Sequence, residues 1–262
     1  MTTKPILISG GGIGGCACAL ALSNNGFTCQ VFEQSTEFAE IGAGIQLGPN
    51  VHKMFKILGI DKKIEEIAFY PDNLIMRDAV DGKEITRVDL GKPFLERFKA
   101  PYGVIHRADL HKVIYQSCLD SENIDLLTSV SIVDFEEHQD GVRAIADDGT
   151  SYDGLALIGA DGLWSEIRPK IVGDGKPRVS GHVAYRAVLP VEEVPKEVCS
   201  DDVVLWAGPK THLVHYKLRR GELFNIVAVF HSDKYEEGWD AFGDPEELNK
   251  RFQNERPEVH ML

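Results

Sequence analysis

The fold is decided by the stretch Ile6-Leu-Ile-Ser-Gly10-Gly-Gly12-Ile-Gly14-Gly15-Cys-Ala-Cys-Ala-Leu-Ala-Leu22, which is followed by Gln30-Val-Phe-Glu33. It predicts a buried strand, a glycine turn, a helix and a second strand ending in an acid, the order of a dinucleotide-binding unit. In such a unit, glycines permit the tight turn, the approach of a pyrophosphate and the close packing of helix on sheet. Five of the six residues from 10 to 15 are glycine, more than an ordinary strand-to-helix turn needs. We therefore assign the dinucleotide site to Gly10, Gly12, Gly14 and Gly15.

Glu33 supplies the acid of this unit. It follows Gly10 by 23 positions, near the interval of about 20 residues at which a carboxylate accepts hydrogen bonds from the ribose. The unpaired N–H groups of the helix N-terminus, and the positive end of its dipole, are expected to face the phosphates. The sequence thus predicts contacts to both the ribose and the pyrophosphate of a dinucleotide.

The composition predicts two modest hydrophobic cores. The chain has 262 residues, of which 43% are hydrophobic, enough for one large core or two smaller ones. A formal net charge of −13 argues against a nucleic-acid partner, because phosphate backbones are bound mainly by Lys and Arg. The N-terminal apolar run is only one strand long, so we expect no signal peptide, no membrane span and a cytoplasmic protein without a membrane partner.

The five cysteines are expected to be reduced. Their number is odd, and Cys16 and Cys18 fall inside the predicted first helix, where small apolar side chains suit the core. A Cys-x-Cys pair can also bind a metal, but no matching Cys or His pair occurs at ligand spacing. We therefore assign no metal ligand.

Beyond Glu33 the sequence predicts further helices and strands. Residues 41–50 form a second glycine-rich segment, which indicates either backbone pressed against a flat group or a flexible surface loop. Residues 151–158 are expected to pair as one strand with residues 142–146. From about residue 177 the alternation of apolar and polar side chains predicts the antiparallel strands of a second sheet. Other expected elements are a helix over 51–58, two strands within 73–90, a helix from His106 to about Ser121 and a helix over 245–253.

Three motifs in this order resemble those of the single-component FAD-dependent aromatic hydroxylases, most of all the salicylate and 3-hydroxybenzoate 6-hydroxylases. They are the glycine motif with Glu33, then His106-Arg107-Ala-Asp109-Leu110, then Gly159-Ala-Asp161-Gly162-Leu-Trp-Ser165-Glu-Ile-Arg168. The resemblance implies an α/β fold, in which a Rossmann-like FAD-binding domain of the glutathione-reductase (GR2) type carries an inserted antiparallel β-sheet substrate domain. It places the FAD-binding domain at 1–70 and 101–177 and the substrate domain at 71–100 and 178–262.

The same resemblance implies further cofactor-binding residues. Gln46, Arg107, Asp161 and Gly162 are expected to contact FAD, and the Asp-Gly pair also the pyridine nucleotide. Taken without the family, Arg107 is equally a solvated charge and Asp161-Gly162 equally a turn. The implied reaction is hydroxylation of a monohydroxybenzoate-type aromatic acid, with FAD as cofactor and NADH or NADPH and O₂ as co-substrates. Whether the chain forms a homodimer is left open.

The chain departs from this family in two places. Family members continue further and carry a Gly-Asp-Ala-Ala-His-Pro motif that contacts the flavin, whereas this sequence stops at His260-Met-Leu262 without one. We therefore expect a truncated product, with the C-terminal part of the FAD-binding domain missing. Pro169 is the second departure, because its ring should interfere with the short helix expected to carry Ser165 and Arg168.

The expected catalytic residues lie on a strand of the second sheet. Alternation along Thr211-His212-Leu-Val-His215-Tyr216-Lys-Leu218 places His212 and Tyr216 on one face, and sends His215 and Lys217 the other way, toward solvent. We hypothesise that His212 is the base for the phenol or a residue that binds it, because histidine titrates near neutral pH, and that Tyr216 is a hydrogen-bonding partner. A surface histidine and a core tyrosine are the alternative. For the carboxylate of the substrate, Arg186 and the pair Arg219 and Arg220 stay open.

Other functions use the same motifs. A truncated, catalytically incompetent FAD-binding remnant of such an enzyme is one alternative. An NAD-dependent dehydrogenase also needs the glycines and Glu33, but the sequence offers it no Tyr-x-x-x-Lys pair and leaves Asp161-Gly162 without a role. A flavin reductase or an epoxidase of the same fold would keep all three motifs.

Overall fold

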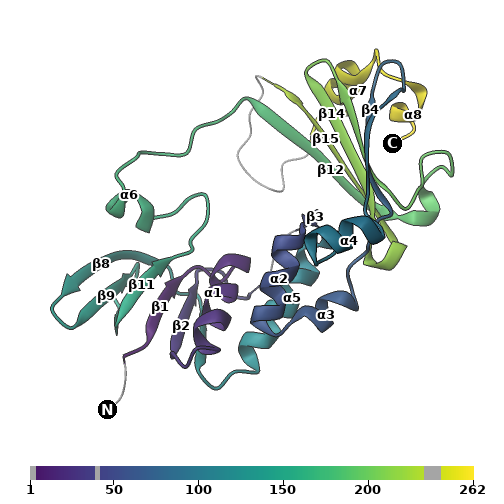
Figure 1. Cartoon of the computed structure of the whole chain (residues 1–262). Helices are drawn as coiled ribbons and strands as arrows, with labels where there is room; N and C mark the ends of the chain where they lie inside the picture. Colours follow the sequence, from purple (N-terminus) through teal and green to yellow (C-terminus); the bar gives the residue numbers. More distant parts are fainter. Residues whose placement is uncertain (1–3, 39–41, 233–242) are drawn as a thin grey trace. The chain divides into compact units, whose positions relative to one another are not determined.

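The computed structural model describes residues 4–38, 42–232 and 243–262, and it divides the chain into two compact units (Figure 1). The domain ranges given above stay a prediction, and the units differ from them because 41–54, 65–70 and 101–107 group with the second unit. The first unit comprises Met1–Glu40, Phe55–Ile64 and Ala108–Arg178, and the second comprises Ile41–Met54, Glu65–Arg107 and Val179–Leu262.

A four-stranded sheet forms the centre of the first unit. Its order is β11-β1-β2-β7, and every neighbouring pair is parallel. Helix α1 buries a stripe of mostly small residues, which includes Gly15, Cys16 and Ala19, and this stripe lets it pack closely. The strand-turn-helix-strand order predicted for residues 6–33 is therefore confirmed. The bounds are β1 (Ile6–Ser9), α1 (Ile13–Ser23), β2 (Cys29–Glu33), β7 (Ile124–Thr128) and β11 (Ala156–Gly159).

A three-stranded antiparallel sheet of order β10-β9-β8 packs on the parallel sheet. The prediction of one strand over 151–158 was wrong, because this stretch changes partner at Leu155. Before that residue β10 pairs with β9, and after it β11 pairs with β1. Gly154 permits the change, since a Cβ there would lie 2.4 Å from Leu7 Cγ. The bounds are β8 (Ile132–His138), β9 (Gly141–Ala146), β10 (Ser151–Gly154) and α6 (Ile167–Ile171).

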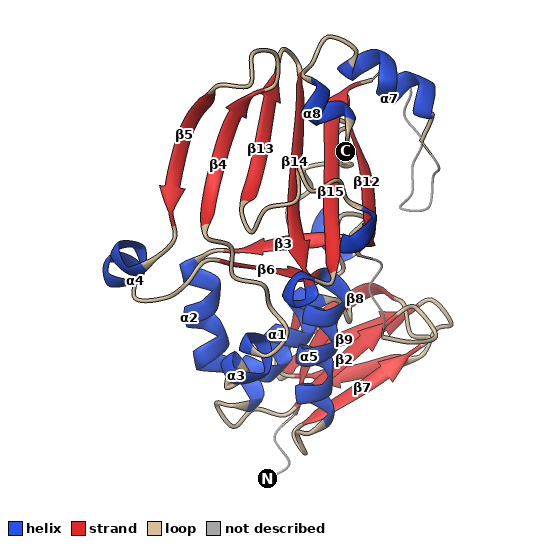
Figure 2. Cartoon of the chain, turned by 90° about the vertical axis from the view of Figure 1, so that its right-hand side faces the viewer, coloured by secondary structure: helices blue, strands red, loops and turns tan. Residues whose placement is uncertain are grey.

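A six-stranded sheet forms the second unit, with the order β12-β15-β14-β13-β4-β5 (Figure 2). Its pairs are antiparallel except for β13 with β4, so the predicted second sheet is confirmed and one parallel pair is added. One face is covered by a core that includes Phe252 of α7 and Val259 of α8. The bounds are β4 (Asn73–Asp78), β5 (Glu84–Asp89), β12 (His182–Pro190), β13 (Val203–Gly208), β14 (Thr211–Leu218), β15 (Leu223–His231), α7 (Pro245–Phe252) and α8 (Pro257–His260).

Strands β3 (Gly44–Leu47) and β6 (Gly103–His106), which are far apart in sequence, pair as a short antiparallel ribbon, the β3–β6 ribbon. It crosses one end of the six-stranded sheet (Figure 2). Its Val104 is buried in a small cluster with Val203, Tyr216 and Leu218 of the sheet. The β3–β6 ribbon therefore belongs to the second unit as a layer over the ends of the strands. The remaining elements are α2 (Pro49–Leu58), α3 (Asp61–Glu65), α4 (Lys92–Phe98), α5 (Arg107–Leu119) and the 3₁₀ turns Val191–Glu193 and Arg219–Gly221.

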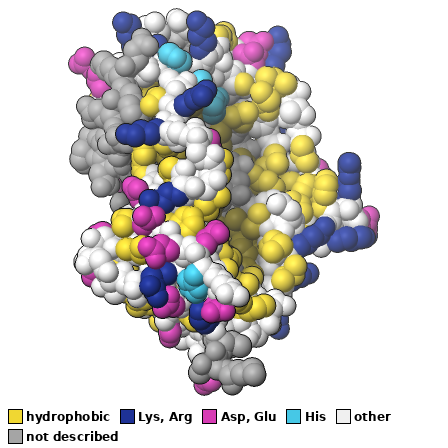
Figure 3. Space-filling model, turned by 90° about the vertical axis from the view of Figure 1, so that its left-hand side faces the viewer, with side chains coloured by type: hydrophobic (Ala, Val, Ile, Leu, Met, Phe, Trp, Pro, Cys, Tyr) yellow, Lys and Arg dark blue, Asp and Glu magenta, His cyan; other side chains and the backbone are white. Residues whose placement is uncertain are grey.

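Two composition-based expectations concern the described residues as a whole. Within them, no helix is long and apolar enough to cross a membrane. All five cysteines are free thiols; Cys16, Cys29 and Cys118 are buried, whereas Cys18 and Cys199 are only partly so. Acidic and basic side chains are interspersed on the face of the molecule shown in Figure 3.

Candidate functional site

The glycine loop between β1 and α1 has the backbone that its sequence predicts. Gly10 has a φ of +107°, and a Cβ there would lie 2.3 Å from the carbonyl oxygen of Ala160, so any larger residue would both strain and clash. A Cβ on Gly15 would lie 1.9 Å from the carbonyl oxygen of Gly10. A Cβ on Gly14, in contrast, meets nothing within 4 Å. The loop is thus tightly packed at its two ends and open at Gly14.

The N-terminus of α1 is a suitable place for an anion. Gly12 is its N-cap and provides no side chain, and the first turn contains no acidic residue. The first N–H groups of a helix lack intrahelical partners and carry the positive end of the dipole. A phosphate is the ligand that such an end favours.

Glu33 lies at the end of β2 and bonds to the same loop. Its Oε2 accepts the N–H of Gly11 at 2.9 Å, and its Oε1 accepts the N–H of Ser35 at 2.9 Å. These two bonds fix the carboxylate beside the glycines. The structure therefore brings together the four glycines and the acid that the sequence assigns to the dinucleotide.

Two supports of the loop were missed by sequence analysis. His111 of α5 is buried, and its Nε2 lies 2.8 Å from the Gly11 carbonyl oxygen. Cys16 donates to the same oxygen at 3.1 Å. The only available signal for His111 was its position on the inward face of a predicted helix, which does not reveal a partner 100 residues away.

Asp161 closes the turn that follows β11. Its carboxylate accepts the hydroxyl of Ser165 at 2.6 Å and the N–H groups of Glu166 and Ile167 at 2.9 and 3.1 Å. Gly162 has a φ of +77°, which this turn requires. Asp161 and Gly162 thus form a rigid turn, and this structural role is compatible with a cofactor contact.

Pro169 does not break the short helix, contrary to the sequence expectation. It is the third residue of α6 (Ile167–Ile171), within the first turn, where backbone N–H groups have no helical acceptor and a missing donor costs nothing. The N–H of Arg168 is instead accepted by the hydroxyl of Ser165 at 2.9 Å.

Gln46 and Arg107, the other two expected cofactor contacts, belong to the second unit: Gln46 lies on β3, and Arg107 is the first residue of α5. Gln46 accepts a hydrogen bond from the hydroxyl of Tyr102. The N–H of Arg107, directly after β6, donates to the carbonyl oxygen of Ala43 at 3.0 Å. A Cβ on Gly44 would lie 2.5 Å from the ring of Tyr216. The flat group that the second glycine-rich segment contacts is therefore this tyrosine ring.

His212 and Tyr216 share one face of the sheet, as predicted, but they differ in surroundings. His212 is exposed to solvent, although not completely. Its partial burial, together with the nearby His182, lowers its pKa. Tyr216 is buried under β3, and burial raises its pKa. Four residues of a strand span about 13 Å, so the two side chains lie too far apart for a direct hydrogen bond. This His212 face also carries Val214, Val227, Val229, Asn225, Ala184, Arg186 and Val188.

The prediction that His215 points to solvent was wrong. It is buried, accepts a hydrogen bond from Trp206 Nε1 at 3.1 Å and stacks on Phe224 with ring centroids 5.3 Å apart. Burial lowers its pKa to about 4. Lys217 is also largely buried and pairs with Asp201 at 2.6 Å. Alternation assigned both residues to the correct face, but the second core covers that face.

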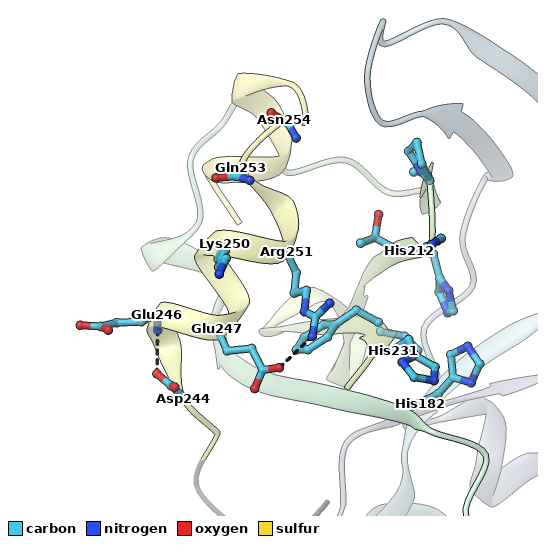
Figure 4. Close-up of a pocket in the computed structure, with 16 residues that line it drawn as sticks. His182, His212, His231, Asp244, Glu246, Glu247, Lys250, Arg251, Gln253 and Asn254 are labelled. Carbon is cyan, nitrogen blue, oxygen red and sulfur yellow. Dashed lines mark hydrogen bonds and ion pairs between the residues drawn. The ribbon is translucent and has the colours of Figure 1, made fainter. Parts of the chain in front are cut away.

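A pocket beside His212 lies where the ends of β12, β14 and β15 approach α7 (Figure 4). His182 and His231 face each other across β12 and β15, with ring centroids 5.7 Å apart. Arg251 of α7 pairs with Glu247 at 3.3 Å. Among the described residues, no group of three potential ligands is placed to hold a metal ion.

These features define a dinucleotide-binding α/β unit joined to a β-sheet unit. The family model described as "FAD binding domain" matches residues 3–256, so the chain belongs to this family and the predicted resemblance is confirmed. The 3-hydroxybenzoate 6-hydroxylase of Polaromonas naphthalenivorans is 43% identical over 258 residues, 98% of this chain and 64% of the relative. The enzyme of that name from Klebsiella oxytoca is 41% identical over 256 residues, with the same coverage of both chains.

Solved structures have the same fold. The structure of Klebsiella pneumoniae HpxO complexed with FAD and uric acid superposes with a TM-score of 0.83 at 26% identity, over 97% of this chain and 63% of that one. A salicylate hydroxylase substrate complex superposes with a TM-score of 0.79 at 22% identity, over 99% of this chain and 65% of that one. The predicted fold class is confirmed. The chain spans about 64% of the length of the two hydroxylases.

Proposed function

We propose that this chain contains the FAD-binding and substrate-binding parts of a flavin-dependent monooxygenase that hydroxylates a monohydroxybenzoate, with NADH or NADPH and O₂ as co-substrates. The observation that carries the proposal is the glycine loop, with Gly10 at positive φ and Glu33 bonded to Gly11. Identities of 43% and 41% to relatives named 3-hydroxybenzoate 6-hydroxylase support the substrate class.

The described residues fit FAD. In the first unit, the uncapped N-terminus of α1 suits the pyrophosphate, the open space at Gly14 admits it, and Glu33 suits the ribose. In the second unit, Gln46 on β3 and Arg107, directly after β6, are proposed to contact the rest of the cofactor. Bound FAD would supply the redox chemistry, namely accepting a hydride from the nicotinamide and activating O₂.

The protein has to bind the aromatic acid, orient it and control its phenol proton. His212 is proposed to accept that proton. Partial burial and the nearby His182 lower the pKa of His212, which favours the neutral imidazole that can accept a proton, and its exposed position leaves it accessible to a ligand. Tyr216, buried against Gly44, is proposed to act mainly by holding β3 in place and through its hydroxyl.

The structure favours Arg186 over Arg219 and Arg220 as the residue that binds the carboxylate. Arg186 lies on the His212 face, one register row from Tyr216, and its charge opposes the rise that burial causes in the pKa of Tyr216. Arg219 and Arg220 instead lie in a turn beyond the end of β14, with φ of 47° and 59°. Between Arg186 and His212 the face carries valines, the apolar wall that an aromatic ring needs.

The substitution Arg186→Met tests this assignment. We expect KM to rise about tenfold or more for 3-hydroxybenzoate and to change little for the neutral 3-hydroxybenzamide, because a charged hydrogen bond is lost only with the acid. Arg220→Met is the matched control. Equal effects of Arg186→Met on acid and amide would remove Arg186 from carboxylate recognition.

The proposed function is tested by adding FAD to the purified chain, desalting it and recording the visible spectrum. NADH or NADPH oxidation is then followed with 3-hydroxybenzoate under air, and the product is identified by mass spectrometry. A retained flavin band and a product heavier by one oxygen atom are expected. A flavin band without product would favour the incompetent remnant, and oxidation of a substrate by NAD⁺ without flavin would favour the dehydrogenase. Light scattering on the same sample tests for a homodimer, which stays a prediction.

A further inference from the structure

The β3–β6 ribbon, which contains Gln46 and ends directly before Arg107, is attached to the six-stranded sheet through a buried amide. Asn225, the third residue of β15, is fully buried, with 0% of its surface exposed. Its Oδ1 accepts the N–H of Gly44 at 2.7 Å, which joins residues 181 positions apart in sequence. A buried amide in the middle of a sheet is destabilising unless its hydrogen bonds are made, so its presence here calls for a function.

The hydrogen bonds converge on a single peptide group. The N–H of Gly44 and the carbonyl of Ala43 belong to the same peptide unit. The N–H donates to Asn225, and the carbonyl oxygen accepts the N–H of Arg107 at 3.0 Å. A peptide held at both its donor and its acceptor cannot rotate without breaking one of these bonds. Asn225 therefore fixes the backbone to which Arg107 is bonded.

The hydrogen bond from Gly44 to Asn225 also fixes the distance between β3 and the six-stranded sheet. Asn225 and Tyr216 are cross-strand partners on β15 and β14. The Tyr216 ring lies in the space that a Gly44 Cβ would occupy, so the backbone of β3 rests on the ring while Asn225 holds its amide. Gln46 lies two residues further along the same strand and accepts the Tyr102 hydroxyl.

The Nδ2 of Asn225 is also informative. It is buried and has no hydrogen-bond partner among the described residues. A leucine at position 225 would have a similar shape and would leave no unpaired donor. The unpaired Nδ2 indicates that the position is occupied by asparagine for its oxygen, which accepts Gly44.

We infer that Asn225 is a positioning residue for the cofactor: through the Ala43–Gly44 peptide it sets the placement of Arg107 and Gln46. This inference rests on the proposed function, because it takes both residues as FAD contacts. It predicts that FAD affinity depends on a side chain of the six-stranded sheet that hydrogen-bonds to the backbone of the β3–β6 ribbon.

The test uses the 262-residue chain and three variants. Asn225→Leu removes the acceptor at nearly constant volume, and Asn225→Asp keeps an acceptor oxygen in the same place. Asn73→Leu is the matched control, because Asn73 lies in the same sheet but bonds to Asp202 instead of the β3–β6 ribbon. The readouts are the FAD dissociation constant from flavin fluorescence and amide hydrogen exchange of residues 42–48 without FAD.

We expect Asn225→Leu to weaken FAD binding about tenfold, the equivalent of one lost hydrogen bond, and to speed exchange at Gly44. Asn225→Asp should recover both, and Asn73→Leu should change neither. The inference is overturned if Asn225→Leu leaves both readouts unchanged, or if Asn73→Leu changes them equally, which indicates a general loss of stability.

Two further outcomes are decisive. If Asn225→Leu does not fold, Asn225→Ser repeats the test, since serine keeps the site polar but cannot reach Gly44, and unchanged FAD affinity in that variant overturns the inference. If the parent chain itself binds no FAD, the proposed function fails together with the inference. Binding by the parent with unchanged affinity in the variants overturns the inference alone.

Discussion

At the residue scale, His212 carries the chemical hypothesis. The substitution His212→Asn keeps a hydrogen-bonding side chain but removes the base, so we expect kcat for hydroxylation to fall about 10²-fold or more. FAD affinity should not change, because His212 is not among the expected cofactor contacts and does not belong to the Tyr216–Asn225 pair that holds β3. The measurement is product formation against pH. The surface residue His138 of β8 offers the control His138→Asn, and a kcat within twofold of the parent for His212→Asn would exclude it as the base.

His215 gives a second prediction at this scale, about stability. Its folded-state pKa is lowered to about 4, whereas an unfolded histidine titrates near 6.5. Below about pH 6.5 this histidine binds a proton in the unfolded state but not in the folded state. The free energy of unfolding should therefore fall as pH drops from about 6.5 to 4. His215→Gln keeps an acceptor for Trp206 and should flatten this dependence, as measured by urea unfolding at pH 7 and pH 5. An equally steep loss in His215→Gln would assign it to other groups.

At the element scale, the two neighbouring glycines of α1 should behave oppositely. A Cβ on Gly15 would overlap the Gly10 carbonyl oxygen, whereas a Cβ on Gly14 meets open space. Gly15→Ala should therefore lower the melting temperature of the FAD-free chain markedly. Gly14→Ala should preserve or raise it, because alanine in a helix is favoured over glycine by about 0.5–1 kcal/mol. Thermal unfolding by circular dichroism compares the pair, and equal losses would contradict the packing described for this loop.

Particular elements also show which features of the structure could be predicted from the sequence. The glycine loop could be predicted because its chemistry is local, from β1 through Glu33. The change of partner at Leu155 could not, because alternation describes side-chain faces and not which strand lies alongside. His215 failed for a related reason, since a second core covers the face that alternation alone suggested was solvated. The bond from Asn225 to Gly44 joins residues 181 positions apart, and no local pattern marks it.

At the scale of the whole molecule, the residues assigned to FAD are divided between two units that each have their own core. Glu33 and the glycines belong to the first unit, and Gln46 and Arg107 belong to the second. A ligand that contacts both units should stabilise both, whereas a ligand held by the glycine loop alone should stabilise only the first. The cofactor assignment can therefore be tested by measuring which of the two units FAD stabilises.

Hydrogen exchange with and without FAD measures the stabilisation of each unit. With FAD at about 100 times its dissociation constant, linkage predicts a stabilisation of about 2.7 kcal/mol in any region that unfolds with loss of the ligand. We expect slower exchange both in β1 and α1 of the first unit and in β3 and β6 of the second. Adenosine diphosphate is the control, because it should protect the first unit alone. Protection by FAD that is confined to the first unit would contradict the roles of Gln46 and Arg107, and would leave a chain that binds only the adenine half of the cofactor.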